Sequence, residues 1–200
     1  YLNVATTTGL ELGGAGLRNV TIDIPAGAEI SLGSNLTTAG VLTLTSGTLK
    51  LNGKDLTING PLTAAAGTAI SSTEASDISI NSATGTTGVL NFSGTDNGVK
   101  TLTINVGANN TASITGTVYV ANTLQLTTGT LRINGANLTI SGDVTGAGMF
   151  SGDATTNLTV NTSGGIFNLL RFAAGGQIVN NLTIDVGLLY SIRLGSNLTV

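Results

Sequence analysis

Apolar and polar residues alternate along most of the chain with a period of two. Residues 137–141 have the sequence Asn-Leu-Thr-Ile-Ser, and the preceding stretch continues the alternation at Leu124, Leu126, Leu131 and Ile133. Because successive side chains of a strand point to opposite faces, this pattern indicates half-buried β-strands. Thr-Gly, Asn-Gly and Ser-Gly pairs between the runs predict sharp turns. Neither helical periodicity nor a capping box is present, so we expect an all-β protein.

A short motif, the anchor, recurs along the chain: Asn, Asp or Thr, an aliphatic residue, usually Thr or Ser, and usually a second aliphatic residue. Neighbouring anchors are 16 to 24 residues apart. One unit of this length cannot bury its apolar face alone, but stacked units can. The first aliphatic residue of the anchor falls at Val20, Leu36, Leu56, Ile78, Leu102, Val118, Leu138, Leu158, Leu182 and Leu198.

A longer repeat groups these units into blocks of about 80 residues. Val20, Leu102 and Leu182 occupy the same block position, and residues 41–60 align with 123–142 without a gap. We therefore interpret 1–200 as a single continuous segment, with blocks 1–19 (partial), 20–101, 102–181 and 182–200 (partial).

Stacked units of this kind predict a parallel β-solenoid. The general preference for right-handed crossovers favours a right-handed β-helix. If each anchor marks one coil, the chain forms about ten or eleven coils and a rod roughly 50 Å long, at about 4.8 Å per coil. An array of β-sandwiches is the alternative, since short strands with regular turns suit it too.

The outward positions of the anchors predict two lines of polar side chains along the rod. A Thr line would comprise Thr21, Thr37, Thr57, Ser79, Thr103, Tyr119, Thr139, Thr159, Thr183 and Thr199. The residue before each anchor forms a second line, with Asn137, Asn157, Asn181 and Asn197 in succession. β-Branched Thr suits an exposed strand surface, and stacked Asn amides can hydrogen-bond along the axis. An ice-binding Thr array is the functional alternative, but Tyr119 interrupts it.

Composition excludes several classes of function. The chain has no Cys and no His, which removes zinc sites, disulfides, thiol nucleophiles and His-based acid–base catalysis. Charged residues are 8% of the chain and the net charge is −3, so we expect no nucleic-acid partner. No run approaches the roughly 18 apolar residues of a transmembrane helix, and we expect no membrane insertion.

The remaining candidates for chemistry are few. Asp55 and Asp77 would lie on adjacent coils, where they could share Ca²⁺ or remain a solvated pair, which we favour because the second block has Asn at both positions. Residues 93–98 look superficially like a cation loop but lack its acid count, and we interpret them as a turn. The Gly-rich stretches 13–16 and 146–148 lack the Lys-Ser/Thr of a phosphate loop. Lys50 and Arg132, equivalent between blocks, are interpreted as surface charges. We expect no enzymatic activity and no catalytic, cofactor-binding or metal-binding residue.

The strings LGSNLT (32–37 and 194–199), LTLTSGTLKLNG (42–53) and LTISGDVTGAG (138–148) resemble repeat arrays in very large bacterial surface proteins. These include adhesins exported with a type IX sorting domain and, more distantly, autotransporter passengers and filamentous-haemagglutinin-like proteins. The resemblance implies a secreted, cell-surface β-helical stalk or filament with an adhesive or matrix role.

A solenoid end exposes unpaired strand edges and core, so we expect the partner to be the protein itself, by axial continuation or end-to-end stacking. Residues 1–12 are interpreted as an ordinary coil. Surface glycans or other matrix are a further possible partner. A polysaccharide-acting β-helix enzyme, which would need a one-off cluster of charged residues, and an ice-binding solenoid are the alternatives.

Overall fold

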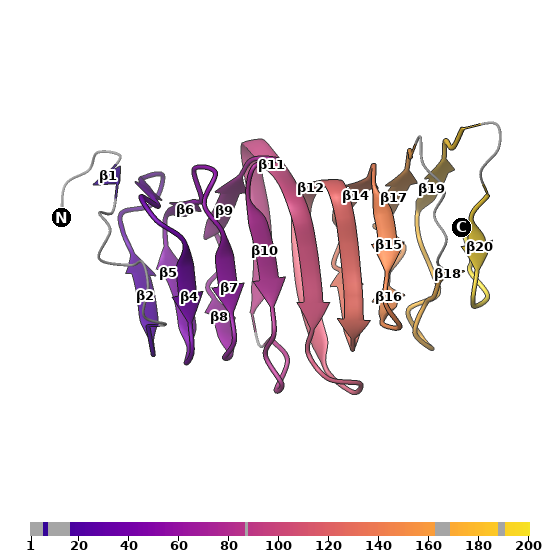
Figure 1. The fold of residues 1–200 in the computed structure, drawn as a ribbon, viewed down its shortest axis with the longest axis horizontal. Coiled ribbons are helices and arrows are strands. Elements are labelled where there is room, and N and C mark those ends of the chain that lie inside the picture. The colour runs from indigo at the N-terminus through magenta and orange to yellow at the C-terminus, as the bar shows by residue number, and fades with distance from the viewer. Residues whose placement is uncertain (1–5, 8–16, 87, 163–168, 188–190) are drawn as a thin grey trace.

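The computed structural model describes residues 6–7, 17–86, 88–162, 169–187 and 191–200, which stack into a rod without any helix in these ranges (Figure 1). The strands are β1 (Thr6–Thr7), β2 (Val20–Asp23), β3 (Glu29–Ser31), β4 (Leu36–Thr38), β5 (Leu42–Ser46), β6 (Thr48–Lys50), β7 (Leu56–Ile58), β8 (Leu62–Ala64), β9 (Ala69–Ser72), β10 (Asp77–Ile80), β11 (Val89–Asn105), β12 (Thr111–Thr128), β13 (Thr130–Ile133), β14 (Asn137–Ile140), β15 (Asp143–Thr145), β16 (Met149–Ser151), β17 (Asn157–Val160), β18 (Leu169–Leu170), β19 (Asn181–Ile184) and β20 (Arg193–Leu194).

Every strand pair in the described ranges is parallel, and each strand pairs with strands one turn before and after it. Partner residues are separated by 19 residues at the shortest, between Ile30 and Leu49, and by 24 at the longest, between Ile78 and Leu102. These separations are the length of one turn. The predicted parallel β-solenoid is confirmed, and the sandwich alternative, which needs antiparallel sheets, is wrong.

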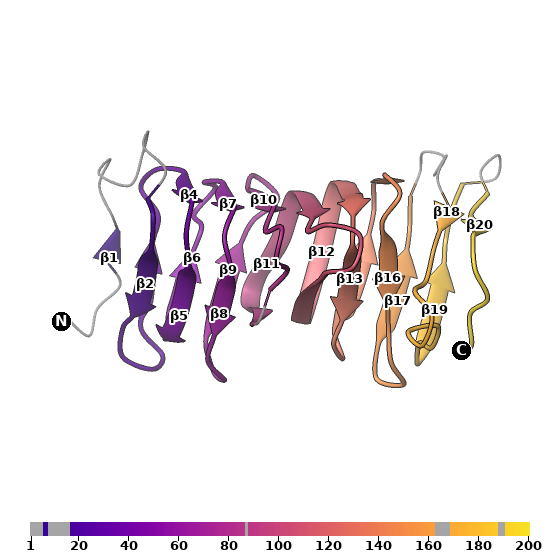
Figure 2. The same cartoon turned by 90° about the horizontal axis from the view of Figure 1, so that it is seen from below.

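Each turn contributes up to three short strands on three different faces of the rod (Figure 2). In the first half of the chain β2, β3 and β4 belong to one turn, and β5, β6 and β7 stack on them in the same order. In the middle of the rod β11 and β12 are long enough to run continuously from one face to the next, with irregular register where they bend. The result is a closed, three-sided coil around one apolar core.

The number of turns is about eight, fewer than the ten or eleven expected from the anchors. The prediction assumed one anchor per turn, but Val20 pairs with Leu42 and Leu36 pairs with Leu56. Val20 and Leu36 therefore lie on two faces of the same turn. The 16-residue spacing that opens each block separates two faces, whereas the spacings of 20 and more are the ones that climb the axis.

Successive blocks are rotated by one face relative to each other. The column that starts with Leu36, Leu56 and Ile78 continues through Leu102, Leu124 and Val144. Leu102 is the block equivalent of Val20, which lies on a different face from Leu36. Four turns carry this column from Leu36 to Leu124, while the block already repeats at Val118. A block is thus a fraction of a turn short of four turns.

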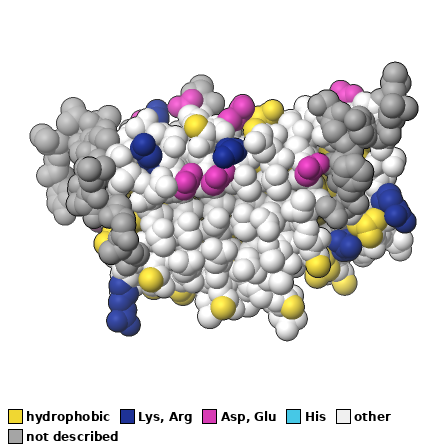
Figure 3. Space-filling model, viewed as in Figure 1, with side chains coloured by type: hydrophobic (Ala, Val, Ile, Leu, Met, Phe, Trp, Pro, Cys, Tyr) yellow, Lys and Arg dark blue, Asp and Glu magenta, His cyan; other side chains and the backbone are white. Residues whose placement is uncertain are grey.

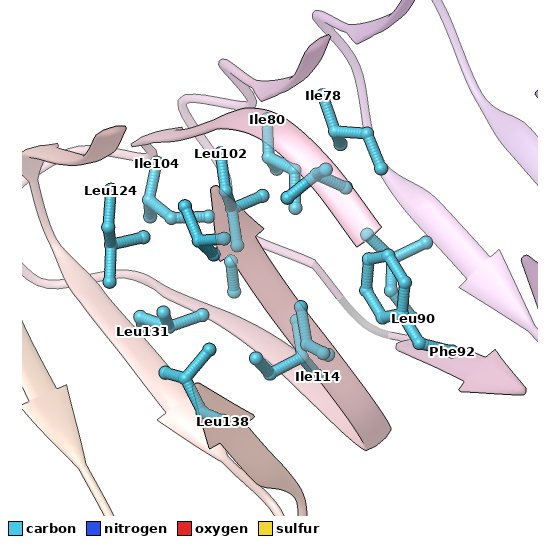
Figure 4. Packing of buried hydrophobic residues seen from close by; sticks show 14 of the residues in the cluster. Ile78, Ile80, Leu90, Phe92, Leu102, Ile104, Ile114, Leu124, Leu131 and Leu138 are labelled. Carbon is cyan, nitrogen blue, oxygen red and sulfur yellow. The ribbon is translucent and has the colours of Figure 1, made fainter. Parts of the chain in front are cut away.

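The core is a continuous stack of aliphatic side chains, as the alternation predicted. Seven of the anchor aliphatics, from Leu36 to Leu158, are buried, and those nearer the ends, Val20, Leu182 and Leu198, are half-buried. Figure 4 shows Leu102, Leu124 and Leu131 pointing toward one another from different turns. Burying one such side chain stabilises the fold by about 1.5–3 kcal/mol, which explains why the stack is continuous.

Glycine is required where the chain turns tightly beneath this core. Gly47 and its block equivalent Gly129 both have positive φ, 80° and 85°. A Cβ atom at Gly47 would collide with the Ile24 side chain, and one at Gly129 with Val106. The duplicated blocks therefore retain the same glycine against the same aliphatic position.

Candidate functional site

The outward Thr side chains form three separate columns instead of the single line expected. One column runs through Thr37, Thr57, Ser79, Thr103, Gln125 and Thr145, a second through Tyr119, Thr139, Thr159 and Thr183, and a third through Thr21, Thr43 and Thr63. The reason is again that two anchors share a turn. Gln125 and Tyr119 each place a large side chain in a column, so neither long column is a uniform Thr array.

Asn side chains form a hydrogen-bonded ladder beside β14, β17 and β19. The Asn157 Nδ2 donates to Asn137 Oδ1 at 2.7 Å, and Asn181 Nδ2 donates to Asn157 Oδ1 at 2.7 Å. Asn180 Nδ2 donates to the same Asn157 oxygen at 3.0 Å. The predicted ladder is confirmed for these turns. Asn197 does not extend it, because Thr199 pairs with Ile178 and this places Asn197 in another column.

Asp55 and Asp77 lie on adjacent turns, as expected, and protein groups engage both carboxylates. Asp55 accepts hydrogen bonds from Asn35 Nδ2 and from the Asp77 main-chain N–H, both at 3.0 Å. Lys100 Nζ lies 3.8 Å from Asp77 Oδ2. The arrangement is a ladder of the same kind as the Asn ladder, with a lysine balancing the charge. In the described ranges, no three His, Cys, Asp or Glu side chains gather as a metal-binding group.

The segment 93–98 belongs to strand β11, so the expected turn is wrong. The register of β11 against β9 is irregular between Phe92 and Asn97, and this bend produces the turn-like sequence. Asp96 forms an ion pair with Lys50, 3.3 Å from Nζ to Oδ2. Residues 146–148 form a bend after β15, as interpreted, while 13–16 lie outside the described residues.

A groove of about 740 Å³ runs over the turns that contain β11, β12, β13 and β16. Ser113, Arg132 and Ser151 are register partners on three successive turns and line its floor. Asp153 and the small residues Ala173–Gly176 line one side. No sequence motif marks this groove, because its residues come from separate turns and only the stacking brings them together.

Asp153 is the acidic residue of the groove and is held by its own turn. Its Oδ1 accepts hydrogen bonds from the Thr155 main-chain N–H at 2.9 Å and from the Thr155 hydroxyl at 2.6 Å. Those bonds from Thr155, with smaller effects from Thr156 and the positive charge of Arg132, outweigh partial burial and lower the pKa of the Asp153 carboxyl. Asp153 is therefore an ionised acceptor at neutral pH.

The rest of the surface carries little charge. Figure 3 shows one face on which Lys, Arg, Asp and Glu are sparse and most exposed side chains are neutral. No helix that could cross a membrane occurs in the part of the chain that the structure describes. Comparisons with protein-family models, with curated proteins and with solved structures find no significant match to this chain.

Proposed function

We propose that the chain is a non-catalytic structural or adhesive rod, a segment of a large secreted protein of the cell surface. The observation that carries this proposal is the use of the polar side chains between turns. Asn137, Asn157, Asn181, Asp55 and Asp77 all take part in axial ladders of hydrogen bonds or ion pairs. Such side chains hold neighbouring turns together, which is the requirement of a rod.

The alternatives fit this arrangement less well. A polysaccharide lyase or hydrolase would need carboxylates free to act on a substrate, whereas Asp55 and Asp153 accept bonds that hold the fold. An ice-binding face would need regular Thr in two neighbouring columns, and Tyr119 and Gln125 interrupt them. The resemblance to bacterial surface repeats supports the extracellular assignment.

Further turns of the same kind are the proposed axial partner, either later in one polypeptide or in a second molecule. β19 has no strand on its outer edge in the described ranges, and Ile184 is 46% exposed. Leu194 and Val200 add exposed apolar surface to the same last turn, 48% and 69% exposed. Covering this surface with another turn would remove it from water, at about 25 cal/mol per Å².

Surface labelling tests the proposed role. Antibodies raised against the 200-residue chain should label intact, unpermeabilised cells that express the natural protein, and external protease should remove the label. Labelling that requires permeabilisation would contradict the proposal. In parallel, the purified chain should release no reducing ends and no unsaturated sugars from neutral or acidic polysaccharides; clear turnover would favour the enzyme.

A further inference from the structure

We propose that the groove over β11, β12, β13 and β16 binds an acidic polysaccharide, with Arg132 contacting a sugar carboxylate. The inference deepens the proposed adhesive role and rests on it. It gives that role a ligand class, polymers containing uronic acids, and a place on the rod.

The direction of the groove suits an extended polymer. Ser113, Arg132 and Ser151 are partners in register, so they lie one above the other along the rod axis. Val89 precedes them in the same column, and the column is therefore at least four turns long. A chain lying along this column meets a hydroxyl, a guanidinium and a second hydroxyl in succession, about 4.8 Å apart.

Arg132 is available for a ligand, and the duplicated blocks show this by comparison. Lys50 occupies the equivalent position in the first block, is half-buried, and is neutralised by Asp96 at 3.3 Å. Arg132 is exposed, and no carboxylate in the described ranges lies within ion-pair distance of it. A guanidinium can bind a carboxylate through two parallel hydrogen bonds, which a lysine cannot do.

Asp153 narrows the ligand class. Thr155 holds its carboxylate at one side of the groove, where it is an acceptor for hydroxyl donors. A simple inorganic anion would be attracted by Arg132 and repelled by Asp153, with no compensating donor. A sugar acid supplies both groups, a carboxylate for Arg132 and hydroxyls for Asp153, Ser113 and Ser151. No aromatic ring lines this groove, so neutral sugars lack a surface on which to stack.

Calorimetric titration of the 200-residue chain with polygalacturonate, alginate and hyaluronan tests the proposal. At least one of the three should bind, and fully methyl-esterified polygalacturonate, which has the same backbone without charge, should not. Arg132→Ala should weaken binding by about ten- to hundredfold, the loss expected for a charge-assisted contact. Arg132→Lys should restore part of it, because the charge returns without the fork.

Lys50→Ala is the matched control and should leave binding unchanged. Arg132 is exposed, so its variants should unfold at the temperature of the original chain, and that measurement separates lost binding from lost fold. Failure of all three polymers to bind, equal binding of the esterified polymer, or equal weakening by Lys50→Ala would overturn the inference. None of these results would affect surface labelling, so the proposed role and the groove fail independently.

Discussion

Leu102 stacks directly on Ile78, although the two residues occupy different positions of the sequence repeat. The same relationship recurs one block later, where Leu182 stacks on Leu158. Contacts across a block junction thus join non-equivalent positions, and the junction is as regular as the interior of a block. This rotation of the blocks leads to a direct test.

Engineered disulfides distinguish the observed stacking from one anchor per turn. Ser79→Cys with Thr103→Cys places two outward thiols on paired residues of adjacent turns, at a spacing that a disulfide can bridge. We expect this pair to cross-link on mild oxidation, as read by a mobility shift on non-reducing electrophoresis. The chain has no native cysteine that could interfere.

Thr103→Cys with Tyr119→Cys is the comparison pair. These residues belong to consecutive anchors, but Thr103 pairs with Gln125, while Tyr119 pairs with Gly98 and Thr139. We expect no intramolecular cross-link. Efficient bridging of this pair would contradict the assignment of two anchors to one turn.

Leu138 tests the core. Its side chain is 1% exposed, so Leu138→Ala should lower the free energy of unfolding by about 2–5 kcal/mol. Leu138→Asp should abolish the cooperative transition of the surrounding turns, because it buries an unpaired charge. Thr139→Asp, on the outward side of the same strand, should change stability by less than about 0.5 kcal/mol. Urea titration followed by circular dichroism measures all three, and similar losses for Thr139→Asp and Leu138→Asp would contradict the register.

Asn157 tests the ladder. It donates to Asn137 and accepts from Asn180 and Asn181, so Asn157→Ala leaves three amide partners without their bond. We expect a loss of about 1–3 kcal/mol in the free energy of unfolding. Asn134→Ala, at an exposed position next to β13, is the control and should be close to neutral. A neutral Asn157→Ala would mean that the ladder does not stabilise the rod.

Asp153 predicts a dependence of stability on pH. Thr155 lowers the pKa of this carboxyl in the folded state, so the unfolded chain binds the proton more readily. The stabilisation is therefore present above the unfolded pKa of about 3.9 and is lost as the pH falls through the lower folded value. Asp153→Asn and Thr155→Ala should both reduce the difference in unfolding free energy between pH 7 and pH 3. An unchanged difference in both variants would show that the hydrogen bonds carry no such effect.

The last turn predicts self-association. In sedimentation velocity runs at increasing concentration, the 200-residue chain should form larger species, because Ile184 and Leu194 present apolar surface beside an unpaired strand edge. Replacing both with Asp should shift the distribution toward monomers. Thr183→Asp, an exposed polar position on the same strand, should have less effect. A wild-type chain that stays monomeric at all concentrations would contradict end-to-end stacking.

The alternation of residues was sufficient to predict the strands, their buried faces and their parallel stacking. Leu56 and Leu138 are buried because a period of two leaves them no other face once a neighbour covers one side. The Asn ladder was predictable for the same reason, since identical side chains recur at the length of a turn.

Closure of the turn was not predictable from the repeat. An anchor shows that a strand is half-buried, but it does not show how many faces the chain passes before it returns to the same column, so Val20 and Leu36 looked like successive coils. The groove was hidden for a related reason. Ser113, Arg132 and Ser151 are unremarkable individually, and their alignment depends on turn lengths that only the folded chain sets.

The rotation of each block by one face determines how a long array of such blocks would meet its surroundings. A side chain that occurs once per block would point in three directions in turn and return to its first direction after three blocks, roughly 50 Å along the axis. Features carried by the block would thus wind around the shaft like the steps of a spiral staircase. A shaft built in this way has no preferred front, and it can engage a surface or a polymer network from whichever side it approaches.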